Sequence, residues 1–214
     1  MPVISLSRQF GAGGKTLGDM VAKRLNFEFL DETLLHKLAQ EANVSVRWVE
    51  GVAREAGGHL MRFLTTLVPS SFIERHVGES GSDFDESKYV MFLTKVIEEV
   101  AEEDNVIILG RGSQFILRNN PRAIMVLLVA ELEDRIKFIM EHYGLDKGRA
   151  EAMVMRHERM RTRFLKNLYS GNPNDPSLYH MVLNTSLISM ETAENLICEL
   201  VGNIVDKEAK PIWD

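Results

Sequence analysis

The stretch "SRQFGAGGKTLG", residues 7–18, constrains the fold more than any other part of this 214-residue sequence. It follows a short apolar run, Val3 to Leu6, and precedes a segment whose apolar residues recur at helical spacing. Glycines at such a turn let the backbone adopt positive φ angles and direct N–H groups at an anion, and the following helix adds the positive end of its dipole. This order predicts a phosphate-binding loop in an α/β protein.

The loop departs from the usual phosphate-loop motif, G-x-x-x-x-G-K-[ST], because Gln9 stands where the first glycine belongs. In the motif, the lysine reaches the outer phosphates and the hydroxyl that follows it ligates Mg²⁺, roles that fall here to Lys15 and Thr16. A dinucleotide-binding fingerprint fails, since Thr16 stands three residues after Gly13. The candidate phosphate cradle comprises Gly11, Ala12, Gly13, Gly14, Lys15 and Thr16. A glycine-rich turn without a ligand is the alternative.

Composition favours one globular domain spanning residues 1–214, because 45% of the residues are hydrophobic and 26% are charged. A formal charge of -6 argues against a broad nucleic-acid surface. The chain shows neither a secretion signal nor an apolar run long enough for a membrane span, so we expect a cytoplasmic protein. The single cysteine, Cys198, fits a reducing compartment and is expected in the core. The oligomeric state stays open, a homo-oligomer included.

Periodicity predicts strands and helices in alternation. Strands are expected at 3–6, 26–32, 105–110, 123–130 and within 179–186, and helices after Asp31, at 88–103, over 131–166 and at 189–205. The runs "NVIILG" and "AIMVLLVA" are typical of parallel strands that helices cover on both faces. Residues 44–87 are expected to form a helical insertion.

Two further stretches carry candidate chemistry. In "VIILGRGSQFIL" a strand again runs into a glycine turn, so Arg111 is expected at the same sheet edge as the first loop, where it could clamp a phosphate. In "MRHERMRTRFLKNLY", helical spacing places Arg156, Arg159 and Arg163 on one face, with Arg161 more to the side. Such a cluster suits a lid over a triphosphate. The alternatives are a surface arginine and a solvated charged face.

Taken in order, these stretches resemble the cytidylate-kinase-like proteins, relatives of cytidylate kinase among the P-loop nucleoside monophosphate kinases. The resemblance rests on "SRQFGAGGKTLG", "FEFLDETLLHKLA", "VIILGRGSQFIL", the arginine-rich segment 156–163 and "DPSLYHMVLNTS". It implies a three-layer α/β P-loop kinase fold with a parallel sheet, an acceptor-binding helical insertion at 44–87 and an arginine-rich lid at 150–175. It also implies phosphoryl transfer from ATP, with Mg²⁺, to a small nucleotide, most naturally CMP or dCMP.

The same resemblance implies roles for individual residues. The cradle from Gly11 to Thr16 would bind the donor phosphates, with Lys15 as the catalytic lysine and Thr16 on the metal. Asp31 and Arg111 would bind the acceptor. Catalytic charge in the lid would come from Arg159, Arg161 and Arg163.

The sequence also departs from the family pattern. Cytidylate kinases read G-S-G-K-G-T, so an ungapped alignment on Gly11 to Gly13 places Gly14 at the lysine position and Lys15 one residue late. Arg8 is a candidate for compensation. Gly112-Ser113 and Asn184 stand where cytidylate kinases have aspartates. Two alternatives follow: a P-loop kinase for another small metabolite, and a nucleotide-binding regulatory protein with weak or no transferase activity.

Overall fold

The fold is built around five parallel strands. A computed structural model describes residues 2–31, 86–166 and 168–206. The strands are β1 (Val3–Arg8), β2 (Glu28–Leu30), β3 (Val106–Leu109), β4 (Ala123–Val129) and β5 (Met181–Asn184), in the order β2-β3-β1-β4-β5. The helices are α1 (Gly14–Leu25), α6 (Glu86–Val100), α7 (Ser113–Ile116), α8 (Leu132–Tyr143), α9 (Lys147–Lys166), η1 (Pro176–Leu178) and α10 (Met190–Asp206).

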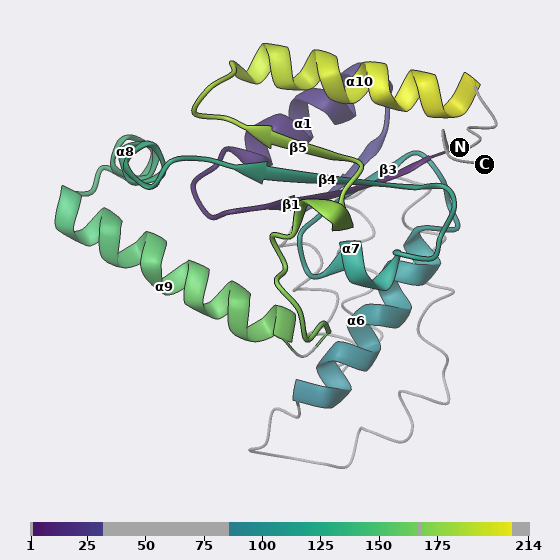
Figure 1. The fold of residues 1–214 in the computed structure, drawn as a ribbon, viewed down its shortest axis with the longest axis horizontal. Coiled ribbons are helices and arrows are strands. Elements are labelled where there is room, and N and C mark those ends of the chain that lie inside the picture. Colours follow the sequence, from purple (N-terminus) through teal and green to yellow (C-terminus); the bar gives the residue numbers. More distant parts are fainter. Residues whose placement is uncertain (1, 32–85, 167, 207–214) are drawn as a thin grey trace, which may run out of the picture.

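Helices cover both faces of this sheet, as the continuous apolar strands predict. The helices α1 and α10 lie on one face, and α6 and α7 lie on the other (Figure 1). The strand β3 is buried at all four positions, because side chains on each of its faces enter a different apolar cluster. The predicted three-layer α/β architecture with a parallel sheet is therefore confirmed.

The carboxyl ends of the strands meet at one edge, since all pairings are parallel and Leu6 is in register with Leu109 and Val126. The helices α8 and α9 stand beyond that edge (Figure 1). They share a small apolar cluster of their own, which includes Ile136 and Val154. The predicted helical stretch 131–166 is thus two helices, and Gly144, at φ +64°, ends the first of them.

Some predictions fall outside the described residues. These are the helix after Asp31 and the insertion at 44–87 except for its last two residues. The short helix α7 was not predicted, because four residues are too few to show a period. None of the described helices is both long and apolar enough to span a bilayer.

Candidate functional site

The first glycine turn leads from β1 into α1 with a geometry suited to an anion. Gly11 and Gly13 have φ angles of +88° and +77°. Gly13 is the residue that precedes the helix and has no side chain with which to cap it, and the first turn of α1 carries no acidic residue. The N–H groups at this helix start therefore keep their capacity to bind a negatively charged group, which the helix dipole also favours.

Neighbouring elements hold this turn closely. A β-carbon on Gly11 would lie 2.9 Å from Cβ and 3.0 Å from the carbonyl oxygen of Arg135 in α8. A β-carbon on Gly13 would overlap the terminal methyl group of Met190, the first residue of α10. Both positions thus favour glycine for their φ angle, and Gly11 also needs it because the backbone of Arg135 is close.

Gln9, which stands at the first glycine when the motif is counted back from Lys15, has a structural role. Its N–H donates to the carbonyl of Leu128 (3.0 Å), which continues the pairing of β1 with β4. Its Oε1 accepts from the N–H of Ala130 (3.1 Å), and its carbonyl accepts from the N–H of Ala12 (3.2 Å). The residue therefore extends the strand and closes the turn with its side chain, in a place where a glycine would leave the Ala130 N–H without this acceptor.

Lys15 and Asp31, which sequence reasoning placed on the donor and acceptor sides, contact each other. The Nζ of Lys15 lies 2.9 Å from Oδ2 of Asp31, and the lysine side chain is 73% exposed. The hydrogen bond that Lys15 donates to Asp31, and then the negative charge of Asp31, raise the pKa of Lys15 above the ordinary lysine value. The structure therefore joins two predicted site residues and directs the lysine toward the end of β2.

Thr16, the predicted metal ligand, lies exposed in the first turn of α1. Within the described ranges no group of three or more His, Cys, Asp or Glu side chains could hold a metal ion. Mg²⁺ in kinases is held largely by phosphate oxygens and water with few protein ligands. A single hydroxyl at the cradle is compatible with that mode.

Arg8, the last residue of β1, lies between the two glycine turns. A β-carbon on Gly14 would be 2.9 Å from Cδ and 3.0 Å from Cγ of Arg8, so the arginine stem crosses the start of α1. A β-carbon on Gly110 would overlap Nη1 of the same side chain. The guanidinium group is therefore placed against the turn that follows β3.

The second glycine turn presents Arg111 at the same edge, as predicted. Gly110, Arg111 and Gly112 have φ angles of +73°, +57° and +75°. A left-handed conformation costs a residue with a side chain about 1–2 kcal/mol, so the strain at Arg111 points to a functional constraint. The turn is fixed to β1 by the Gly110 N–H, which donates to Leu6 (2.9 Å). The Ser5 and Ser113 hydroxyl groups, 2.7 Å apart, add a buried hydrogen bond.

The predicted lid arginines separate into two kinds. Arg161 is only 13% exposed, and it donates to Oε1 of Glu158 (3.1 Å) and to Oδ1 of Asn174 (2.9 Å). Arg159 and Arg163 are exposed. Of the three, only Arg161 faces the body of the protein. The arginine that helical spacing places to the side of the charged face is therefore the one that contacts other residues.

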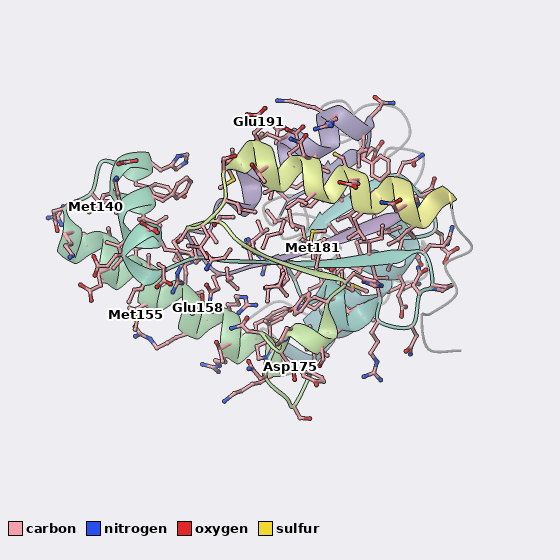
Figure 2. All side chains as sticks on the ribbon, turned by 45° about the horizontal axis from the view of Figure 1, so that its top comes forward. Met140, Met155, Glu158, Asp175, Met181 and Glu191 are labelled. Atoms are coloured by element: carbon pink, nitrogen blue, oxygen red, sulfur yellow. The ribbon has the colours of Figure 1, made fainter. Side chains whose placement is uncertain are left out.

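Glu158 connects the lid helix to the phosphate loop, and sequence reasoning missed it. It lies midway along α9 (Figure 2). Its Oε2 accepts from the N–H of Phe10 (3.4 Å) and lies 3.6 Å from Nη1 of the buried Arg135. Beside it the rings of His157 and Phe10 stack with centroids 4.0 Å apart. Glu158 is the one acidic residue within the arginine-rich run, and the sequence could have indicated it for that reason. Nothing in the sequence distinguishes Arg135.

Gln114 and Tyr179 were also missed, and they lie near each other at the ends of the strands. Gln114 is 3% exposed and belongs to α7, directly after the second turn, and its side chain interacts with that of Tyr179. Burial raises the pKa of Tyr179, although Ser7 and the charge of Arg161 act in the opposite direction. The Tyr179 hydroxyl donates to the carbonyl of Pro173. Polar side chains therefore lie next to the two turns as well as within them.

Comparison with known proteins gives a consistent result. The model of the cytidylate kinase-like family matches residues 3–187. A cytidylate kinase from Methanocaldococcus jannaschii is 22% identical over 204 residues, which cover 94% of this chain and 98% of that protein. An uncharacterized protein from Eubacterium ventriosum has a similar structure, with a TM-score of 0.68 at 18% identity over 94% of this chain and 99% of that one. The structure of shikimate kinase from Acinetobacter baumannii, in complex with shikimate, is also similar. Its TM-score is 0.51 at 16% sequence identity, and the match covers 98% of this chain and 96% of that one.

Proposed function

Because the chain belongs to the cytidylate kinase-like family, we propose that it transfers the γ-phosphoryl group of ATP to a nucleoside monophosphate, CMP or dCMP. The chain is a phosphotransferase with a P-loop kinase fold. One observation carries the proposal: two glycine turns, one suited to an anion and one presenting Arg111, end neighbouring parallel strands at one sheet edge. The proposed location is the cytoplasm, where ATP and the nucleoside monophosphate are available and Cys198 stays a free thiol.

On the donor side, the cradle from Gly11 to Thr16 binds the phosphates of ATP through backbone N–H groups and the start of α1. Mg²⁺, when bound, neutralises charge on the β- and γ-phosphates, and Thr16 is the residue that would contact it. Arg135 is a further donor-side cation, because it is buried against Gly11 and its Nε makes no hydrogen bond within the described residues.

On the acceptor side, Arg111 binds the phosphate of the monophosphate, because a guanidinium group can hold two phosphate oxygens at once. Asp31 lies at the end of the neighbouring strand β2, where it orients the acceptor. The arginines of α9 bring positive charge to the far side of the transferred group, and Arg161 is nearest to the body of the protein. Arg159 and Arg163 reach the phosphates only if the lid moves.

The reaction needs no covalent intermediate with the protein. An oxygen of the acceptor phosphate attacks the γ-phosphorus in line, and the bond from that phosphorus to the β-phosphate oxygen breaks to leave ADP. The acceptor is already an anion, so no strong base is required. Catalysis comes from positioning the two phosphates and from neutralising their charge.

The proposal is tested by following ADP release from ATP and Mg²⁺ with a panel of nucleoside monophosphates. We expect release with CMP and dCMP at rates well above those with AMP, GMP and UMP. ADP release with another acceptor alone would mean that this acceptor, and not CMP or dCMP, is the substrate. ATP binding without ADP release would mean that the protein is a nucleotide-binding regulatory protein and not an enzyme.

A kinase for another small metabolite is the second candidate, and the second turn supports it. Gly112 follows Arg111 where cytidylate kinases have an aspartate, and Leu168 packs against it. Asn184, at the other substituted position, uses its Oδ1 to accept from the N–H of Ser186 (3.0 Å). The second turn therefore lacks a carboxylate at Gly112, whereas Asn184 ends β5, the edge strand beyond β4. Adding shikimate and small hydroxylated acids to the panel covers this candidate.

A further inference from the structure

We propose that Arg8, and not Lys15, is the cation that contacts the transferred phosphoryl group, and that Lys15 positions Asp31. The inference rests on the proposed phosphoryl transfer. It assigns a catalytic role to the last residue of β1, the strand that leads into the first turn, whose guanidinium group lies against the second turn.

The position of Arg8 fits this role. Its stem crosses Gly14 at the start of the anion-binding helix, and its guanidinium group lies against Gly110, one residue before Arg111. The phosphoryl group must pass between the donor cradle and the acceptor arginine during transfer, and the Arg8 guanidinium lies in that region. The side chain is also only partly buried, so a ligand can reach it.

Gly14 explains how the replacement is accommodated. In the ungapped alignment with cytidylate kinases, Gly14 stands at the lysine position, and its missing side chain leaves the space that the Arg8 stem fills. Any side chain at this residue would meet Cδ and Cγ of Arg8 at about van der Waals overlap. The arginine thus occupies, from the strand, the region that a lysine would enter from the helix.

Lys15 is directed elsewhere. Its amine is bound to Asp31 at the end of β2, and the pairing raises its pKa, so it stays charged and holds that carboxylate. A lysine committed to the acceptor-side aspartate affects how the acceptor is oriented more than how the γ-phosphate is stabilised.

The step places no proton on Arg8. The bond between the γ-phosphorus and the β-phosphate oxygen breaks, a bond from the acceptor oxygen to that phosphorus forms, and Arg8 donates hydrogen bonds to the phosphoryl oxygens throughout. Its guanidinium group stays protonated, as arginine does in proteins.

The test compares kcat and KM of Arg8→Gln, Arg8→Lys, Lys15→Ala and the double variant Arg8→Ala/Gly14→Lys, with Arg118→Ala, an exposed arginine after α7, as the control. Thermal melting checks folding, and Arg8→Gln keeps most of the stem that packs on Gly14. We expect Arg8→Gln to lower kcat by about 100-fold, the scale for one transition-state donor. Arg8→Lys should recover at least tenfold of that loss.

The double variant is the sharpest arm, because a lysine at position 14 can enter the space that the arginine leaves. We expect it to exceed Arg8→Gln in kcat by at least tenfold, a gain that a merely structural role for Arg8 would not give. Lys15→Ala should raise the acceptor KM with less than a tenfold change in kcat. A kcat within twofold of wild type in Arg8→Gln, together with a 100-fold loss in Lys15→Ala, would overturn the assignment.

Binding separates this proposal from the proposed function. If the wild type transfers no phosphoryl group, the function fails, and the Arg8 assignment is judged from the dissociation constants of ATP and ADP. Arg8→Gln should then remove any preference for ATP over ADP, and a preserved preference would overturn it. If transfer occurs and Arg8→Gln leaves both kcat and this preference unchanged, the Arg8 assignment fails while the function stands.

Discussion

The two glycine turns have almost the same backbone geometry and present different chemistry. Gly13 precedes α1 with φ 77° and ψ 15°, and Gly112 precedes α7 with φ 75° and ψ 14°. The first turn opens a helix of 12 residues, whereas the second opens a helix of four. Only the first therefore has a substantial helix dipole to offer an anion, and the second contributes the side chain of Arg111.

This difference indicates how one local geometry supports both halves of a transfer site. At the first turn we propose that the backbone binds, and the glycines there leave space for Arg8, Met190 and Arg135. At the second turn we propose that the side chain of Arg111 binds, from a residue with φ +57°. Variants should thus affect donor binding through glycines and acceptor binding through one arginine.

The largest effect is expected from Gly13→Ala. The substitution places a side chain on a residue at φ +77°. The end of the Met190 side chain can move aside, but the backbone strain shifts the cradle, and a shift of about 1 Å can cost on the order of 100-fold. We expect ATP affinity to fall by roughly that factor, measured by calorimetric titration. Gly144→Ala is the matched control, because Gly144 also has a positive φ but has open space around it. Equal loss in both variants would show that strain at any position, and not at the cradle in particular, is responsible.

Arg111→Gly separates strain from function at the second turn. Glycine adopts φ +57° without the cost that arginine bears, so the melting temperature should hold or rise. Loss of a charge-assisted contact with phosphate is worth about 1.5–3 kcal/mol, so KM for the acceptor should rise about 10- to 100-fold. The KM for ATP should stay within threefold. A larger change in the ATP KM would show that Arg111 also contributes to ATP binding, so that donor and acceptor binding are not divided between the two turns.

Glu158→Gln tests how much the contact of the lid with the first turn contributes, beside the contact that Leu168 of the lid makes with Gly112 in the second turn. Glu158 is partly exposed and accepts from Phe10 and Arg161, so neutralising it should lower the free energy of unfolding by about 1–2 kcal/mol. Glu151→Gln, an exposed acid on the same helix, is the control. Chemical unfolding measures both. The ATP KM should change more than the acceptor KM in Glu158→Gln, and the reverse pattern would mean that Glu158 acts mainly through the second turn.

The smallest effect is expected at His180, which belongs to neither turn. Its Nδ1 accepts from the N–H of Met125 (3.0 Å), and burial lowers its pKa below 6.5. The unfolded chain binds this proton more readily, so the stability that His180 contributes is present above about pH 6.5 and is lost as the pH falls through the lower folded pKa.

His180→Asn keeps an acceptor and removes the titration. Urea unfolding at pH 7.5 and pH 5.5 should therefore show a smaller decline for the variant than for the wild type, while kcat at pH 7.5 stays unchanged. Identical declines in both proteins would assign the pH dependence to other groups, and a large loss of kcat would mean that His180 influences the turns.

Sequence reasoning predicted the sheet and the shared edge of the turns, because apolar runs between helices determine a parallel sheet and glycines mark where strands end. It did not predict the pairing of Lys15 with Asp31, since the two residues belong to different elements and only the register of β2 brings them together. Helical spacing placed Arg161 apart from the other lid arginines but could not tell which side meets the protein. Gln9 looked like a defect in the motif until its hydrogen bonds to β4 and Ala130 were seen.

The central claim is that the two turns form one centre for phosphoryl transfer between bound phosphates. It is tested most directly by incubating the protein with ATP labelled at the γ-phosphate, CMP and Mg²⁺, and separating the products. The account predicts that the label appears in CDP, and that this labelled product is lost in Gly13→Ala and strongly reduced in Arg111→Gly at low CMP. Label found only in inorganic phosphate, or remaining wholly in ATP, would contradict it.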